Sequence, residues 1–171
     1  IVISHRNLFD GSEIVTSYLG LKNNDHISGV LSFNFDYGLN QLWCCLNTSA
    51  TLHLHNFIFP INFFQHIIEK DITVLPLMPV IISKIFSKPI EDHINTCLKK
   101  VRLICSSGGS ISASMIASLS KSFINSEIYL MYGLTEAFRS SYLSPEYVDK
   151  KKNSIGKAIP GVELYVMNEE G

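Results

Sequence analysis

The feature that most constrains the fold of this chain is a regular alternation of short apolar strands with amphipathic helices. Strands are expected at residues 27–33, 49–55, 71–77, 101–105 and 127–132. Helices are expected at residues 4–21, at 38–47, from Pro60, from Pro79 and after the segment 106–110. Strands separated by helices of this length are typical of βαβ units, in which neighbouring strands run parallel. The sequence therefore predicts an α/β fold, with a mostly parallel sheet and flanking helices.

Local signals place the helix starts and the buried helix faces. Ser4 is a good N-cap, and Pro60 and Pro79 stand where a helix can begin, because proline is tolerated in the first turn. Apolar residues then recur at three-to-four spacing, which marks one face of each helix as buried. The residues expected to face the core are Ile61, Phe64, Ile67 and Ile68, then Ile81, Ile82, Ile85 and Phe86, and finally Met115, Ile116, Leu119 and Phe123.

Charge and hydropathy exclude two classes of partner. Because 14 lysines and arginines oppose 15 aspartates and glutamates, the chain has no basic excess that would bind a nucleic acid backbone. The longest apolar stretch, 74–82, contains two prolines and is far shorter than the roughly 18 residues of a membrane-spanning helix. The one charge run, 149–153, is expected to be a solvated loop.

The chain is nevertheless apolar, with 17% charged residues and a mean hydropathy of +0.20. Soluble domains average about 25% charged residues. Because the chain also starts at Ile1 and has no signal-peptide pattern, we expect an internal fragment of a larger protein, whose other parts would cover apolar surface.

Cysteine and histidine positions give weaker information. The four cysteines are Cys44, Cys45, Cys97 and Cys105. They show no C-x-x-C spacing, so reduced and mostly buried thiols in a cytoplasmic protein are expected. His53 and His55 share one face of a predicted strand, but the spacing supplies no third ligand. A metal site there is a minor alternative.

Two loops carry unusual chemistry at the carboxyl ends of predicted strands, where open α/β sheets bind ligands. The first is "SSGGS" at 106–110, in which Gly108 and Gly109 allow the backbone to approach a flat ligand closely. Free N–H groups at the start of the following helix add donors. Paired glycines in a turn are common, so this loop alone is a weak signal.

The second loop, "YGLTE" at 132–136, is more specific. Tyr132 offers a ring for stacking, and Gly133 keeps the backbone thin beside it. Thr135 supplies a hydroxyl for a phosphate oxygen, and Glu136 supplies an oxygen ligand suited to Mg²⁺. In this order the residues would hold a purine, an α-phosphate and its metal. The alternative is ordinary structure, with Tyr132 at the edge of the core and Thr135 and Glu136 in the first turn of a helix.

The second loop resembles the Y-G-x-T-E motif of the adenylate-forming superfamily, which includes acyl-CoA synthetases, luciferases and the adenylation domains of peptide synthetases. Further segments are similar to motifs of that family in the same order, and the resemblance covers essentially the whole chain. They lie at 2–8, 31–42, 72–86, 106–110 and 154–171. The first follows the family's phosphate loop, the second is its acyl-pocket motif, and the last is the strand region after the nucleotide motif. Within the superfamily, the chain looks most like acyl-CoA ligases associated with bacterial exosortase loci.

The resemblance implies part of the large N-terminal domain of an enzyme that joins a carboxylic acid to ATP and passes the acyl group to a thiol, usually that of coenzyme A. Tyr132 would stack on adenine, Thr135 would contact the α-phosphate, and Glu136 would hold Mg²⁺, so Thr135 and Glu136 are the expected catalytic residues. The other residues expected to bind the nucleotide are Gly108, Gly109, Ser110, Met131, Gly133 and Leu134.

The resemblance also places the acyl substrate beside Phe35, Asp36 and Gly38. Phe35 stands where many acyl-CoA ligases have a histidine or another aromatic residue, and it would act as a wall. Asp36 is a departure, because amino-acid-activating domains use an aspartate in a similar motif to bind the substrate's ammonium group. A buried carboxylate needs a cation, a donor or water. An amino-acid substrate is therefore the second hypothesis.

Several parts of the family's active site are absent from these 171 residues. They are the phosphate loop, the aspartate that binds ribose and the C-terminal domain with its catalytic lysine. We therefore expect the isolated chain to have negligible ligase activity.

Two functions of other classes remain open. A non-catalytic nucleotide-binding module could use the same loops. A serine hydrolase is the other, since Ser118 and Lys121 form an S-x-x-K pattern, but no partner motif supports it and chance in a serine-rich helix explains it.

Overall fold

The computed structural model describes residues 1–87, 90, 94, 98–151 and 153–169, and it confirms the predicted α/β architecture. The strands are β1 (His26–Gly29), β2 (Thr51–Leu54), β3 (Val74–Leu77), β4 (Leu103–Ser106), β5 (Glu127–Tyr132), β6 (Ser141–Leu143) and β7 (Lys157–Ala158). The helices are α1 (His5–Leu19), α2 (Asp36–Thr48), α3 (Pro60–Glu69), α4 (Pro79–Ile85), α6 (Ala113–Ser122) and α7 (Pro145–Val148), with a 3₁₀ turn at Leu98–Lys100.

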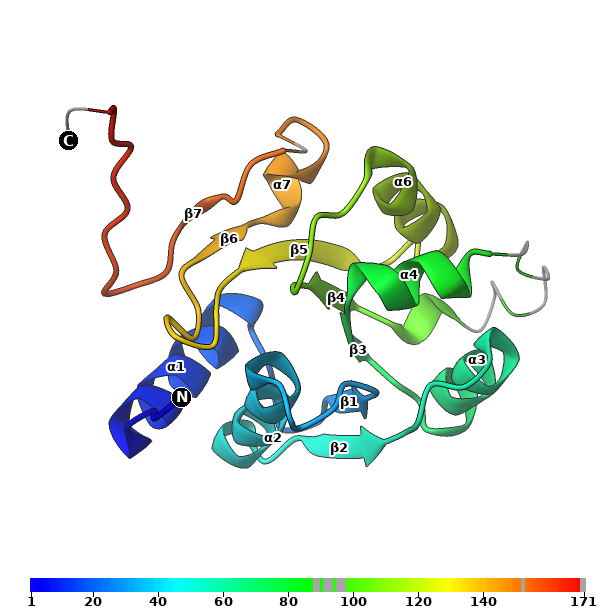
Figure 1. Ribbon diagram of the computed structural model, residues 1–171. Helices are drawn as coiled ribbons and strands as arrows, with labels where there is room; N and C mark the ends of the chain where they lie inside the picture. The colour runs from blue at the N-terminus through cyan, green and yellow to red at the C-terminus, as the bar shows by residue number, and fades with distance from the viewer. Residues whose placement is uncertain (88–89, 91–93, 95–97, 152, 170–171) are drawn as a thin grey trace.

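The strands form one seven-stranded sheet in the order β2-β1-β3-β4-β5-β6-β7. Neighbours from β2 to β5 are parallel, and β6 and β7 join antiparallel. The chain steps from β1 to β2 in one direction and then returns past β1 to β3. Because parallel crossovers are right-handed, this reversal places the helices on opposite faces of the sheet. Figure 1 shows α1 and α2 on one side and α3, α4 and α6 on the other.

Helix ends follow the local signals in the sequence. The Ser4 side chain accepts a hydrogen bond from the backbone N–H of Asn7, as an N-cap does, and Ser112 does the same for Met115 at the start of α6. Gly20 ends α1 in the left-handed conformation, with φ of 57°. Pro60 and Pro79 are the first residues of α3 and α4, as predicted.

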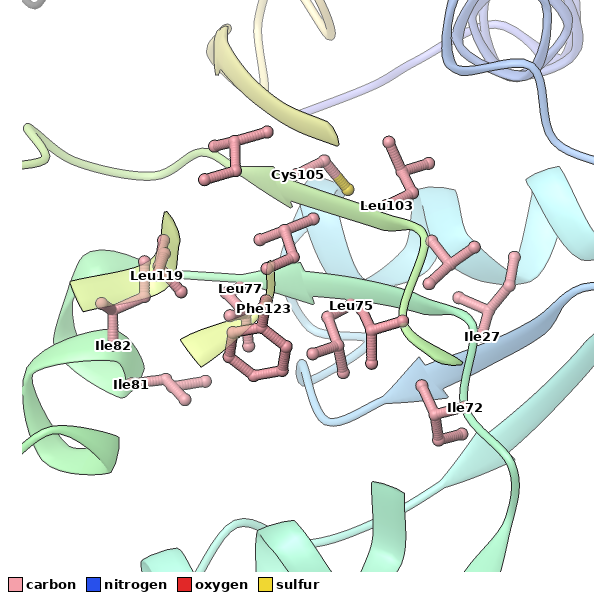
Figure 2. Packing of buried hydrophobic residues seen from close by; sticks show 14 of the residues in the cluster. Ile27, Ile72, Leu75, Leu77, Ile81, Ile82, Leu103, Cys105, Leu119 and Phe123 are labelled. Carbon is pink, nitrogen blue, oxygen red and sulfur yellow. The ribbon is translucent and has the colours of Figure 1, made fainter. Parts of the chain in front are cut away.

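The core lies between β3, β4 and the helices α4 and α6. Figure 2 shows its packing through Leu75, Leu77, Leu103, Cys105, Ile81, Ile82, Leu119 and Phe123, with Ile27 and Ile72 at one end. Full burial of one such side chain contributes about 1.5–3 kcal/mol. This packing fixes β4 and β5 as neighbours, so the loops that follow them open at the same edge of the sheet.

A partly buried ion pair between Asp25 and Arg102 ties several elements together at the amino-terminal edge of the sheet. Asp25 Oδ1 accepts hydrogen bonds from Arg102 Nε and from Thr73 Oγ1, both at 2.8 Å, and Asp25 Oδ2 accepts one from the Lys22 backbone at 2.8 Å. Arg102 Nη2 also contacts Asp25 Oδ2 and donates to the Gly20 carbonyl at 2.9 Å. These bonds join the end of α1 to the starts of β1, β3 and β4.

The buried face of α3 is rotated from the predicted one. Phe64 and Ile67 are buried as predicted, whereas Ile61 and Ile68 are exposed and Phe63 and His66 are buried in their place. Three-to-four spacing is satisfied by either set, so the sequence pattern could not choose between them. Phe86, predicted to face inward after α4, and Met115 of α6 are only partly buried.

The strand predicted within the segment 154–171 forms only at β7. Residues 161–169 contain no strand, and Val166 is fully exposed. A strand needs a neighbour to complete its backbone hydrogen bonds, and no described strand lies beside these residues. The red end of the ribbon in Figure 1 extends away from the sheet.

The cysteine and membrane predictions agree with the structure where it describes them. Cys44, Cys45 and Cys105 are free and buried, and burial raises the pKa of Cys45 and of Cys105 to about 11 and that of Cys44 to about 12. Cys97 lies outside the described residues. Among the helices described, none has the length and apolar character that crossing a bilayer requires.

Candidate nucleotide site

A cavity of about 540 Å³ lies beyond the carboxyl ends of β4 and β5. Its lining comes from three segments that are far apart in sequence, namely residues 107–111, 130–134 and 153–155. Seven of the residues that the sequence analysis assigned to nucleotide binding are among them: Gly108, Gly109, Ser110, Met131, Tyr132, Gly133 and Leu134. The two predicted loops therefore share one cavity.

The glycine loop forms one wall. Gly108 has φ of 82°, in the left-handed region that favours glycine, and a Cβ built on it would lie 3.0 Å from Met78 Cε. A Cβ on Gly109 would lie 3.5 Å from Pro79 Cγ. The loop is therefore packed against the start of α4, and its backbone is open to the cavity.

The end of β5 forms a second wall. Tyr132 lines the cavity and is 43% exposed, so its ring is accessible to a flat ligand. A Cβ on Gly133 would lie 2.5 Å from the Phe138 carbonyl oxygen, which means that only glycine fits where the following turn closes on itself.

Met131 is buried beside Tyr132, and it contacts α1. The Tyr18 hydroxyl on α1 lies 2.9 Å from Met131 Sδ, and the Tyr18 ring stacks on Tyr142 of β6 at a centroid distance of 4.2 Å. The position of this part of the lining thus depends on α1 and β6 as well as on β5.

The third wall was missed by the sequence analysis. Asn153, Ser154 and Ile155 line the cavity. The described residues of 149–153 are exposed, as predicted for a solvated loop, and Asn153 belongs both to that loop and to the cavity wall. Pairing of β6 with β7 brings residues 153–155 to the cavity, and Ser141 Oγ donates to the Ile155 carbonyl at 2.6 Å. The neighbouring Lys150 is exposed, as predicted, and the pattern of charges alone gave no signal for this wall.

Thr135 and Glu136 follow the cavity wall in a turn that leads to β6, not in a helix. The turn includes a hydrogen bond from the Ala137 N–H to the Leu134 carbonyl at 3.1 Å. Neither Thr135 nor Glu136 lines the cavity. Glu136 is exposed and has no hydrogen bond or ion pair to another residue that the structure describes, so its carboxylate is free for an external cation.

The predicted acyl-binding residues lie at the start of α2. Phe35 is the exposed residue before the helix, and Asp36 is the first residue in it. Gly38 is buried, and a Cβ on it would lie 2.1 Å from the Ser32 carbonyl oxygen. None of the three lines the cavity, so the structure does not bring them into direct contact with the nucleotide loops.

Arg139 connects the two regions, and the sequence analysis did not identify it. Its Nη1 lies 3.3 Å from Asp36 Oδ2, which supplies the cation that a buried aspartate was predicted to need. The guanidinium also lies 4.8 Å from the centre of the Tyr37 ring. A Cβ built on Gly133 would lie 3.2 Å from Nη1, so the guanidinium packs directly behind one cavity wall.

In the structure, His53 and His55 lie beside two further histidines, but the four rings are not arranged as ligands of a metal ion. The ring of His66 on α3 stacks on His55 at 4.4 Å, and His26 on β1 lies 5.0 Å from His53. Stacked rings do not direct their nitrogens at one point. Within the described residues, no group of three or more candidate ligands is arranged to hold a metal ion.

These histidines make stability depend on pH. Burial, together with His55 and His53, lowers the pKa of His66 from 6.5 to about 4. The unfolded chain therefore binds more protons between these values, and the free energy of unfolding should fall as pH drops from 6.5 to 4. We expect His66→Gln to remove on the order of 1–2 kcal/mol of this decrease, after allowance for solvent screening. Urea unfolding across this pH range measures it, and an identical pH dependence in the variant would contradict it.

The S-x-x-K pattern has no structural support. Ser118 and Lys121 lie on α6, which packs on the core through Ile116 and Leu119. No hydrogen bond joins Ser118 to Lys121. The structure agrees with the interpretation of this pattern as chance.

Comparison with known proteins decides the family. The model of the AMP-binding enzyme family matches residues 1–171. The chain belongs to this family. The match confirms the resemblance to adenylate-forming enzymes, and it also accounts for the segments that lie outside the cavity. The narrower placement among exosortase-associated ligases stays a prediction.

The chain is similar to two curated relatives with different names and lengths. The chain is 22% identical to a 4-coumarate–CoA ligase-like protein of Arabidopsis thaliana over 175 residues, covering 96% of this chain and 32% of the relative. It is 28% identical to bacitracin synthase 1 of Bacillus licheniformis over 149 residues, covering 85% of this chain and 3% of the relative. The chain therefore spans a third or less of the length of these relatives.

Solved structures support the fold assignment. The N-terminal domain of FACL13 from Mycobacterium tuberculosis superposes with a TM-score of 0.84 at 17% identity, covering 94% of this chain and 40% of that one. VinN gives a TM-score of 0.81 at 21% identity, covering 98% and 41%. The o-succinylbenzoate–CoA synthetase of Bacillus subtilis, in complex with ATP and magnesium ion, gives 0.82 at 18%, covering 97% and 34%. At these identities the likeness concerns the fold.

The carboxylate in the turn after the cavity wall suits magnesium bound through a nucleotide. Mg²⁺ commonly uses one or two carboxylates together with substrate phosphates and water, and does not need a cage of protein ligands. Glu136 offers one free carboxylate beside Thr135, and no fuller ligand cluster exists among the residues described. The residues present therefore fit a metal that arrives with ATP.

Proposed function

We propose that this chain is the nucleotide-binding part of an adenylate-forming acid–thiol ligase, which activates a carboxylic acid with ATP and then transfers the acyl group to a thiol. The observation that carries this proposal is the shared cavity, because the paired glycines and the half-exposed Tyr132 line the same space. Membership of the AMP-binding family supports the same activity.

The proposal assigns a role to each group. Tyr132 stacks on the adenine, and the backbone of Gly108 and Gly109 lies close to the base on the other side. Thr135 donates its hydroxyl to the α-phosphate at the rim, and Glu136 holds the Mg²⁺. The metal supplies neutralisation of the charge that develops as pyrophosphate leaves. Asn153 and Ser154 add polar groups to the third wall.

The acyl group is proposed to lie between α2 and the turn after β5, beside Phe35, Asp36 and Gly38. Phe35 forms a wall, since it has no polar atom to offer, and coenzyme A is the proposed thiol acceptor. An amino-acid substrate is the second candidate, because bacitracin synthase 1 is a relative and Asp36 could bind ammonium. The ion pair with Arg139 counts against it, since the Asp36 charge is already compensated. A carrier-protein thiol is the corresponding alternative acceptor.

We further propose that the chain works as a piece of a longer cytoplasmic protein, in which other segments supply the phosphate loop and the catalytic lysine. The lengths of the relatives support this. The isolated 171 residues should then show negligible acid-dependent exchange of pyrophosphate into ATP. Exchange at the rate of the full-length protein would contradict this part of the proposal.

The stacking role of Tyr132 gives the direct test. We expect Tyr132→Ala in the full-length protein to weaken ATP binding about 10-fold or more, because stacking of a base on an aromatic ring is worth about 1–3 kcal/mol. Tyr147→Ala is the matched control, since both tyrosines are 43% exposed and only Tyr132 lines the cavity. Calorimetric titration with ATP, alongside acid-dependent pyrophosphate exchange, measures both. Equal effects of the two substitutions, or exchange that needs no acid, would count against the proposed function.

A further inference from the structure

Asn153 differs from the other described residues of the cavity lining, because its side chain alone offers a hydrogen-bond donor and an acceptor on neighbouring atoms. The lining also contains Ser107, Ser110 and Ser154, but a hydroxyl presents a single oxygen. The hydroxyl of Ser154 already accepts a hydrogen bond from the backbone N–H of Gly156 at 3.0 Å. An amide carries its carbonyl oxygen and its NH₂ group side by side. Asn153 can therefore contact two adjacent positions of a ligand at once.

The amide of Asn153 is available to a ligand, and the backbone around it is anchored. The residue is exposed, and its side chain makes no hydrogen bond to another residue that the structure describes. The Ser154 N–H donates to the Lys151 carbonyl at 2.9 Å, which closes the turn that contains Asn153. On the other side, the bond from Ser141 Oγ to the Ile155 carbonyl holds the wall against β6. Little further ordering is then needed when the amide meets a ligand.

The proposed binding mode of the nucleotide leaves this wall facing the edge of the base. Tyr132 and the backbone of Gly108 and Gly109 are proposed to contact the two faces of the adenine ring. A flat ring that is held by its faces presents its edge to the remaining lining, which is the segment 153–155. Proteins commonly recognise an unpaired base in this way, by stacking on its faces and by hydrogen bonds to its edge. Asn153 carries the polar group that suits this position.

Adenine has an edge that matches an amide. Its 6-amino group is a donor, and the ring nitrogen beside that group is an acceptor. The carbonyl oxygen of an asparagine can accept from the amino group while its NH₂ group donates to the ring nitrogen, as asparagine does with adenine in DNA. A purine without the 6-amino group loses the first of these two bonds.

We propose that Asn153 is a specificity-determining residue for the nucleotide, which selects adenine through two hydrogen bonds to its 6-amino edge. The inference rests on the proposed function and adds to it the group that recognises the base. Ile155 lines the same wall but has no polar side-chain atom, so it packs beside the ring and does not distinguish one purine from another.

The test compares two nucleotides on two forms of the full-length protein. Calorimetric titration gives Kd of the wild type and of Asn153→Ala for ATP and for purine riboside 5′-triphosphate, which lacks the 6-amino group. We expect the wild type to bind ATP about 10-fold more tightly, the discrimination typical of an asparagine–adenine pair. Asn153→Ala should bind the two equally, because only ATP loses affinity. Asn62→Ala should keep the wild-type ratio, since Asn62 is an exposed asparagine on α3 outside the cavity lining.

Each ratio compares two nucleotides on one protein, so partial unfolding of a variant affects both alike. A wild-type ratio near one, or a ratio that Asn153→Ala leaves unchanged, would overturn the inference. Equal weakening of both nucleotides would also overturn it, because it would place Asn153 against the sugar or the phosphates, beside the open hollow that it shares with Lys150 and Lys151. In these cases weaker ATP binding by Tyr132→Ala would leave the proposed function standing. Absence of ATP binding by the wild type would reject the proposed function and this inference together.

Discussion

Replacing Glu136 with glutamine in the full-length protein is expected to slow adenylation by about 100-fold or more, because loss of one group that stabilises transition-state charge costs about 10²–10³ in rate. The substitution keeps the side-chain volume and removes only the negative charge that would hold Mg²⁺. Glu136 is exposed and makes no contact that folding requires, so the melting temperature should stay nearly constant. The effect should be seen in kcat, and it should be largest when Mg²⁺ is limiting.

A matched control for this experiment is Glu13→Gln, since Glu13 is an exposed glutamate on α1, away from the cavity. Acid-dependent pyrophosphate exchange is measured for both variants over a magnesium titration. A rate for Glu136→Gln equal to that of the control at low Mg²⁺ would remove Glu136 from the metal site. Reduced exchange together with a lower melting temperature would instead assign it a structural role.

The second large effect concerns stability. We expect Asp25→Ala to lower the free energy of unfolding by about 2–3 kcal/mol, because hydrogen bonds to a buried charged acceptor are lost while the Arg102 guanidinium stays partly exposed to water. Asp25 accepts bonds from three other residues that join α1, β3 and β4, and it is 2% exposed. Urea unfolding of the variant measures the loss. Asp10→Ala is the control, because Asp10 pairs with Arg6 at the surface and such pairs contribute little.

The same aspartate should contribute to acid sensitivity. Burial raises the pKa of Asp25, but the hydrogen bonds from Arg102, Lys22 and Thr73 outweigh it, so the pKa lies below its usual 3.8. The stabilisation is therefore complete above the unfolded-state pKa and is lost as pH falls through the lower folded-state pKa. A loss of less than about 1 kcal/mol on substitution at neutral pH, within the range of an exposed pair, would contradict this account of the network.

Much of the fold followed from local physics. The N-cap at Ser4, the helix starts at Pro60 and Pro79, and the parallel pairing of β4 with β5 depend on capping, on proline geometry and on the connection lengths, all of which the sequence contains. On α3, Phe64 and Ile67 were predicted correctly, but Ile61 and Ile68 were wrong because a neighbouring set of residues meets the same spacing. The segment 161–169 was wrong because strand propensity has no effect where no neighbouring strand completes the ladder.

The candidate site divides in the same way. The residues of both loops could be named from the sequence. An aromatic ring that can stack, a glycine without a side chain and a carboxylate follow one another in an order that suits one ligand. The third wall at Asn153 and the buried Arg139 could not, because contacts between residues far apart in the chain create them. The sequence did state that Asp36 needed a partner, but it could not say which cation would supply it.

By itself, then, the sequence determined the layered α/β fold, the two loops that line the cavity and the family, because each depends on short segments whose conformation and chemistry are local. Only the tertiary structure decided which residues close the cavity and how the Asp36 charge is balanced. These outcomes depend on the strand order and on the strained turn at Phe138. Both bring together side chains that lie far apart in the sequence, and the sequence pattern does not specify such contacts.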